Sequence, residues 1–251
     1  MSPIVTSLII FACVFGGAMI GLSLRSILPD HHLSSDSRDV IKLTIGLIGT
    51  MSALLLSLLV ASAKGSFDTR RTELTQIATN TIMLDRVLAH YGPDAAETRE
   101  MLRKALARMI DELWSNDGSL QNPVLSQLSN RELLFDKIQQ LTPKNETQRA
   151  LQTQAEAIAI GIGQTRWLLN EQAVSSISVP LLVVVVFWLT TLFLTFGTLT
   201  PRNMTVVIAL FVGSLSVAGA LFLILELDQP FNGLITISDV PLKNALVVLG
   251  K

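Results

Sequence analysis

Residues 177–225 read 177-ISVPLLVVVVFWLTTLFLTFGTLTPRNMTVVIALFVGSLSVAGALFLIL-225. Two apolar runs, 177–199 and 204–225, are separated only by Thr200-Pro201-Arg202-Asn203. A bilayer core about 30 Å thick needs roughly 20 apolar residues of helix, and each run has that length. Because the connection is so short, the two runs must be antiparallel neighbours. This stretch therefore predicts a transmembrane helical hairpin.

Two further runs, 3–24 and 40–63, have the same length and character. Lys42 is tolerated in the second run because a lysine near a helix end extends to the headgroups. The first run exceeds a signal-peptide core and has no basic residue before it, so we interpret it as a retained helix. With 49% hydrophobic and 16% charged residues, the chain of 251 residues has the composition of a membrane protein.

The region between the second and third runs is polar, and its periodicity is helical throughout. One face carries apolar residues from Leu74 to Tyr91, and Gly92-Pro93 ends that helix. Strand alternation is absent, so the sequence predicts an all-α, four-helix membrane protein with a helical extramembrane domain. The expected divisions are 1–63 (first two membrane helices), 64–176 (helical domain), 177–225 (last two membrane helices) and 226–251 (C-terminal segment).

Four spans place both termini and the helical domain on one side of the membrane. Basic residues near the membrane are more numerous on that side, and the positive-inside rule then predicts a cytoplasmic domain in an inner or plasma membrane. The side with the helical domain has Lys64, Arg70, Arg71, Arg166 and Lys243. The opposite side has Arg25, Arg38 and Arg202, with Lys42 at its edge.

Several classes of function are excluded or disfavoured. The net charge of −1 leaves no basic face, so we expect no nucleic-acid partner. The single cysteine, Cys13, excludes an intrachain disulfide and a cysteine-based zinc knuckle. No nucleophile or nucleotide motif is present, so we expect neither an enzyme nor an organic cofactor, with a bound inorganic ion as the one ligand left open.

The second membrane run contains a stripe of small and weakly polar residues at helical spacing. It consists of Gly46, Thr50, Ala53, Ser57, Ala61 and Lys64. Small residues allow helices to approach closely, with hydroxyls bonded to neighbouring carbonyls. Alternatively, the same stripe lines water in an oligomeric pore. Two other small-residue sets favour helix packing: Gly17 with Gly21, and Gly213 with Ser216 and Ala220.

Two groups of residues have the chemistry of cation ligands. Glu226 and Asp228 follow the last apolar turn, and Pro230 ends that helix. They form either a solvated helix end or a site that attracts cations. His31 and His32 lie in a loop rich in aspartate, which is either a weak metal or pH-sensing site or a solvated loop that starts the next helix.

The segment 221-LFLILELDQPFNGLITIS-238, with 64-KGSFDTRR-71 and 84-LDRVLAHYGPDA-95, resembles a bestrophin-like family of membrane proteins. This resemblance covers nearly the whole chain. Bestrophins are pentameric anion channels with four membrane helices, cytoplasmic termini and a large helical cytoplasmic domain. They have an acid-rich Asn/Asp-Pro-Phe-Gly segment after the last membrane helix. Here Glu226, Asp228, Pro230 and Phe231 occupy that segment.

The resemblance implies a homo-oligomeric ion channel, with five subunits in a lipid bilayer and permeating ions as partners. Its pore would be lined by the second membrane helix. The residues expected to line the pore are Gly46, Thr50, Ala53, Leu54, Ser57, Leu58, Ala61 and Lys64. Leu54 or Leu58 would narrow the path by dewetting. The alternative is a non-conducting membrane scaffold or sensor whose helical domain binds a ligand or a protein.

Overall fold

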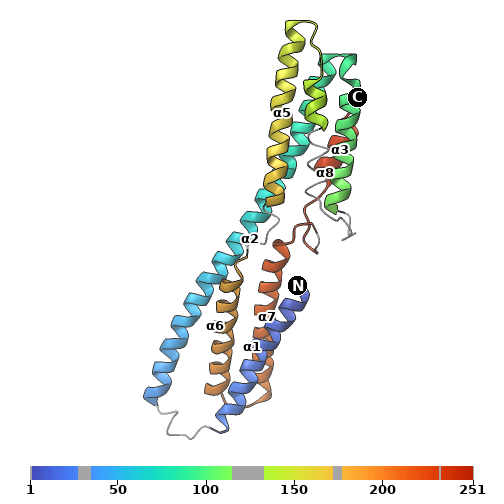
Figure 1. The fold of residues 1–251 in the computed structure, drawn as a ribbon. Helices are drawn as coiled ribbons and strands as arrows, with labels where there is room; N and C mark the ends of the chain where they lie inside the picture. Colours follow the sequence, from blue (N-terminus) through green and yellow to red (C-terminus); the bar gives the residue numbers. More distant parts are fainter. Residues whose placement is uncertain (1, 28–34, 115–132, 172–176, 232, 251) are drawn as a thin grey trace. The chain divides into compact units, whose positions relative to one another are not determined.

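The computed structural model describes residues 2–27, 35–114, 133–171, 177–231 and 233–250. Within these ranges the regular secondary structure is helical (Figure 1). The chain divides into two compact units. Unit 1 comprises residues 1–66 and 175–229, and unit 2 comprises residues 67–174 and 230–251. The sequence predicted the boundaries between these regions after residues 63, 176 and 225.

Among the described residues, four helices are long and apolar enough to cross a membrane, and all four begin or lie in unit 1. They are α1 (Pro3–Arg25), the first part of α2 (Ser35–Tyr91), α6 (Val179–Leu199) and α7 (Met204–Leu227). The predicted hairpin is confirmed, because only residues 200–203 separate α6 from α7 and the two helices run in opposite directions (Figure 1). Asn203 caps α7, its side chain accepting a hydrogen bond of 2.8 Å from the Val206 N–H. The all-α prediction with four membrane helices is therefore confirmed.

Glycines allow α1 and α6 to pack at very short range. A β-carbon on Gly17 would lie 2.9 Å from Thr190 Cγ2 and 3.0 Å from the Thr190 carbonyl oxygen. A β-carbon on Gly21 of α1 would overlap the Leu194 carbonyl oxygen, and one on Gly197 of α6 would overlap the Ala18 carbonyl oxygen. Both contacts are closer than the one at Gly17. α1 also lies beside α7 (Figure 1). The predicted packing role of Gly17 and Gly21 is confirmed.

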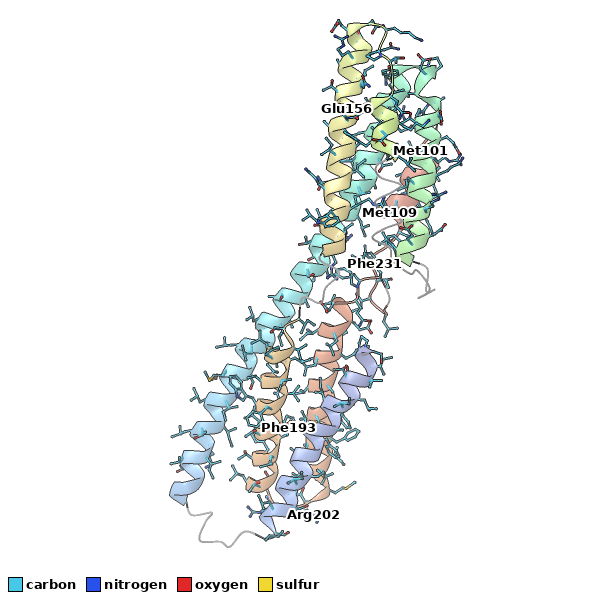
Figure 2. The ribbon with its side chains drawn as sticks, in the orientation of Figure 1. Met101, Met109, Glu156, Phe193, Arg202 and Phe231 are labelled. Atoms are coloured by element: carbon cyan, nitrogen blue, oxygen red, sulfur yellow. The ribbon has the colours of Figure 1, made fainter. Side chains whose placement is uncertain are left out.

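The predicted packing face of α7 is correct for only one of its three residues. A β-carbon on Gly213 would meet the ring of Phe193 of α6 at 3.2 Å (Figure 2), but Ser216 and Ala220 are exposed. The buried face carries Leu210, Ser214, Ala218, Leu221 and Ile224 instead. The physical reason is that every face of this helix is apolar, so spacing alone does not identify the face that meets protein.

Unit 2 contains the rest of α2, η2 (Pro93–Ala95), α3 (Ala96–Trp114), α5 (Glu146–Glu171) and α8 (Val240–Val248), and residues 133–139 are also helical. The predicted apolar face of α2 is buried, including Leu74, Leu84 and Leu88. The helix ends where expected, because Gly92 has φ of 117°, a conformation that favours glycine. The Gln148 side-chain amide donates to the Tyr91 carbonyl at 2.9 Å.

Candidate functional site

One face of α2 is buried in unit 1. Ser52, Leu59 and Ala63 have at most 3% of their surface exposed. Leu59 and Ala63 belong to one apolar core with residues of α1, α6 and α7, such as Val14, Val185 and Leu221. This face therefore fixes the rotation of α2 about its own axis within unit 1.

The predicted stripe lies on the other side of α2. A step of 100° per residue places Ser57 roughly 140° from Ser52 around the helix. All eight residues predicted to line a pore are exposed in the protomer: Gly46, Thr50, Ala53, Leu54, Ser57, Leu58, Ala61 and Lys64. A β-carbon on Gly46 would have no heavy atom within 4 Å. The stripe therefore does not serve as a packing seam inside one protomer.

The surface of the stripe combines hydroxyl groups with large apolar side chains. The Thr50 hydroxyl donates to the Leu47 carbonyl at 2.8 Å, which satisfies its donor within the helix and leaves oxygen lone pairs free. Leu54 and Leu58 are 72% and 55% exposed. A small, weakly polar strip thus runs beside a row of uncovered leucines.

The two carboxylates after the last apolar turn have different surroundings. Glu226 lies inside α7 and is only 3% exposed, so the expectation of a solvated helix end is wrong for this residue. Its backbone carbonyl accepts hydrogen bonds from two N–H groups, that of Asp228, which is the C-cap residue, and that of Gln229. Because Glu226 makes further interactions, its burial is compatible with its polar character.

No metal-binding cluster is visible in the described part of the chain, in the sense of three or more His, Cys, Asp or Glu side chains brought together. Glu226 and Asp228 therefore lack a third ligand of this kind among the described residues. The other two residues suggested as metal ligands, His31 and His32, lie outside the described residues.

The remainder of the acid-containing segment belongs to unit 2, where Pro230 is buried and Phe231 half-buried. The Trp114 Nε1–H at the end of α3 donates to the Ile237 carbonyl at 3.0 Å, and the Ile237 N–H donates to the Pro230 carbonyl at 2.8 Å. The rings of Trp114 and Phe231 meet edge to face at 5.6 Å (the latter labelled in Figure 2). Trp114 therefore holds this segment at both ends.

Sequence reasoning missed Trp114. The available signal was weak: a tryptophan ends a helix whose exposed residues are mostly charged. Its partner carbonyl is 123 residues further along the chain. Periodicity within one helix carries no information about such a partner.

Four apolar spans around a common core, together with a separate helical unit, define an all-α integral membrane protein. A family model for the bestrophin-like domain matches residues 12–242. The chain belongs to this bestrophin-like family, which confirms the resemblance inferred from the sequence.

Solved structures support the same fold. The chain is similar to a bacterial bestrophin homologue from Klebsiella pneumoniae carrying an isoleucine-to-threonine mutation, with a TM-score of 0.66 and 12% identity over 97% of this chain and 99% of that one. The chain is also similar to a tyrosine-to-alanine mutant of a bacterial bestrophin homologue from Klebsiella pneumoniae. The TM-score is 0.64 and the sequence identity is 13%, over 95% of this chain and 99% of that one. No curated protein matches the chain.

Proposed function

We propose that this protein is a homo-oligomeric ion channel whose pore is lined by α2 of each protomer. The observation that carries the proposal is the division of α2 into two sides. One side is buried against α1, α6 and α7, and the other presents Gly46, Thr50, Ala53, Ser57 and Ala61 outside the protomer. Membership of the bestrophin-like family supports the same function.

The chemistry of the exposed side favours water over lipid. Small side chains leave room for a hydrated ion, and hydroxyl lone pairs supply weak ligands along its path. A lipid-facing surface gains nothing from these groups, since hydrocarbon neither hydrates an ion nor hydrogen-bonds a hydroxyl. Around a symmetry axis, the exposed leucines Leu54 and Leu58 would form an apolar ring that closes the path by dewetting.

The family resemblance supports five subunits in the assembly. The distribution of basic residues supports a cytoplasmic position for both termini and for unit 2, in an inner or plasma membrane. In this proposal the partners are lipid, further copies of the chain and permeating ions, and the protein is not an enzyme.

Ion flux through proteoliposomes tests the proposal. Purified protein is reconstituted, and flux is measured for the unmodified chain and for Ser57→Trp, which puts a large ring on the exposed stripe. We expect flux in the first case and its near abolition in the second. Leu8→Trp is the matched control, because Leu8 is 66% exposed and belongs to α1, so it is not part of the stripe on α2.

The outcomes separate the candidate functions. If the oligomer lacks a central opening and conducts no ion, the protein is a scaffold or sensor rather than a channel. Uptake that saturates with a small-molecule substrate would indicate a transporter. If Ser57→Trp conducts like the unmodified protein in an unchanged oligomer, α2 does not line the path with this face.

A further inference from the structure

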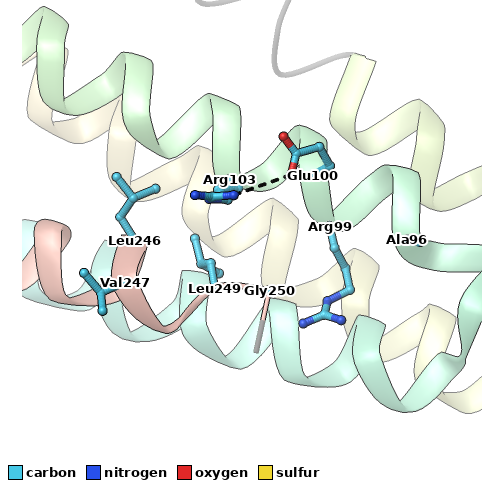
Figure 3. A pocket seen from close by; sticks show the side chains of 8 residues that line it. All are labelled: Ala96, Arg99, Glu100, Arg103, Leu246, Val247, Leu249 and Gly250. Carbon is cyan, nitrogen blue, oxygen red and sulfur yellow. Dashed lines mark ion pairs between the residues drawn. The ribbon is translucent and has the colours of Figure 1, made fainter.

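A cavity of about 540 Å³ lies between α3 and the C-terminal helix of unit 2 (Figure 3). One wall is formed by Ala96, Arg99, Glu100 and Arg103 of α3. The other is formed by Leu246 and Val247 of α8 and by Leu249 and Gly250 after it. Its volume falls within the range of pockets that hold small organic molecules. The two walls differ in chemistry, one being charged and the other apolar.

Arg99 is fixed in place at the charged wall. Its Nε–H donates to Asp85 Oδ1 at 2.7 Å and its Nη2–H donates to Asp85 Oδ2 at 2.9 Å. Asp85 is buried, with 4% of its side chain exposed, and also accepts from the Gly250 N–H at 3.4 Å. The hydrogen bond to Asp85 raises the pKa of Arg99 above its usual value. The guanidinium is therefore permanently charged and preorganised.

Donors remain on this guanidinium after the pairing. An arginine side chain has five N–H donors, and the bidentate pair uses two of them. Within the described ranges, no other acceptor bonds the remaining three donors. The Arg99 side chain is 22% exposed, so these donors are within reach of a ligand in the cavity.

A second guanidinium lies one turn further along the same face of α3. Arg103 is 56% exposed, and its nearest carboxylate is Glu100, at 3.9 Å. Glu100 is shared with Lys104, at 3.6 Å. The lining carries two guanidinium groups, Arg99 and Arg103, against one carboxylate, Glu100. Asp85 does not line the cavity but offsets the charge of Arg99, so the wall offers a monoanion paired N–H donors and no excess of positive charge.

The opposite wall offers apolar contact. Val247 is 64% exposed although it belongs to unit 2, and the half-buried side chain of Leu246 lies beside it (Figure 3). Leu249 also lines the cavity but is only 5% exposed. An apolar body covering these side chains would remove hydrocarbon surface from water. A simple inorganic anion makes no use of this wall.

We propose that the pocket between α3 and α8 binds an organic carboxylate. The carboxylate accepts hydrogen bonds from Arg99 and Arg103, and its aliphatic body packs on Leu246 and Val247. Planar guanidinium groups recognise carboxylates through paired N–H donors, which fits the charged wall. This binding is independent of ion conduction, so it stands whether or not the protein is a channel.

Binding of hexanoate to the full-length protein in nanodiscs tests the proposal. Saturation-transfer NMR gives a dissociation constant for hexanoate, for its neutral analogue hexanamide and for acetate, which lacks the aliphatic body. We expect saturable hexanoate binding in the millimolar range or tighter. Hexanamide and acetate should each bind at least about tenfold more weakly, because each retains only one of the two interactions.

Variants at exposed positions locate the site without disturbing the fold. Arg103→Ala should weaken hexanoate binding about tenfold, the value of a charged hydrogen bond. Val247→Asp places a carboxylate on the apolar wall and should weaken it by a similar factor. Arg86→Ala is the matched control, because Arg86 is an exposed arginine of unit 2 that does not line the pocket. Its hexanoate affinity should be unchanged.

Three results would overturn the proposal. One is the absence of saturable hexanoate binding at millimolar concentrations. A second is equal binding of hexanamide and hexanoate, since the guanidinium groups would then contribute nothing. The third is an unchanged hexanoate affinity in both Arg103→Ala and Val247→Asp when both variants melt at the temperature of the unmodified protein.

Discussion

The close contact between α1 and α6 makes a graded prediction for three neighbouring glycines. A β-carbon at Gly16 would have no heavy atom within 4 Å. At Gly17 it would lie 3.0 Å from the Thr190 carbonyl oxygen. At Gly21 it would overlap the Leu194 carbonyl, which belongs to the backbone and has no rotamer with which to avoid the clash. Single alanine substitutions at these positions therefore differ only in what the added methyl group meets.

The magnitudes follow from this geometry. Gly16→Ala gains helix propensity at no steric cost, an effect of up to about 1 kcal/mol in favour of folding. Overpacking usually costs about 1–3 kcal/mol, so we expect about 1 kcal/mol for Gly17→Ala and about 3 kcal/mol for Gly21→Ala. At about 2–4 °C per kcal/mol for a chain of this size, Gly21→Ala should lower the melting temperature by roughly 6–12 °C.

Thermal unfolding of the purified protein in detergent, followed by tryptophan fluorescence, measures these shifts. Trp188 lies on α6 itself and reports on this packing. The expected order of melting temperature is Gly16→Ala, unmodified protein, Gly17→Ala and Gly21→Ala, from highest to lowest. If Gly21→Ala melts with the unmodified protein, or if Gly16→Ala loses as much stability, the contact does not hold α1 against α6.

Three further predictions concern unit 2. Trp114→Phe keeps an aromatic ring but removes the donor to the Ile237 carbonyl, which should lower the free energy of unfolding by about 1–2 kcal/mol; protection of residues 230–237 in hydrogen exchange should fall, and unchanged exchange would contradict the role of this bond. Asp85→Asn leaves the half-buried Arg99 guanidinium without its counter-charge and should lower the free energy of unfolding, measured in denaturant, by about 2 kcal/mol. The double variant Asp85→Asn/Arg99→Gln should recover part of this loss. Burial raises the pKa of the Tyr91 hydroxyl, so on raising the pH this proton is lost from the unfolded chain before the folded one, and the free energy of unfolding falls above about pH 10. Tyr91→Phe should reduce that fall. The variant should keep its stability at neutral pH, since the buried hydroxyl has no hydrogen-bond partner among the described residues.

Part of the candidate site followed from the sequence because its pattern lies within one helix. The spacing of Gly46, Thr50, Ala53 and Ser57 defined a face of α2, and all four residues are exposed in the protomer. The sequence left packing and pore lining open as roles for this face. Within one protomer, α2 packs through the opposite face, where Ser52, Leu59 and Ala63 are buried. The face with Gly46, Thr50, Ala53 and Ser57 is therefore not a packing face inside the protomer.

The carboxylates and the pocket were less accessible to sequence reasoning. Glu226 looked like the start of a solvated segment because it follows an apolar run, yet its side chain is buried at the end of α7. The pocket of unit 2 brings Arg99 together with Leu249, which lie 150 positions apart in the sequence. Neither arrangement has a local pattern that predicts it.

The number of membrane helices, their approximate ends and the helical character of the polar region could be predicted from local sequence. These properties depend on local quantities: the length of an apolar run, the spacing of apolar residues, and breakers such as Gly92-Pro93. Tertiary structure alone decided which side of each apolar helix meets protein, as α7 demonstrates with Ser214 and Ala218 buried and Ser216 and Ala220 exposed. The physical reason is that lipid tails are as apolar as a protein core, so hydropathy cannot distinguish the two, and only the fit between neighbouring helices does.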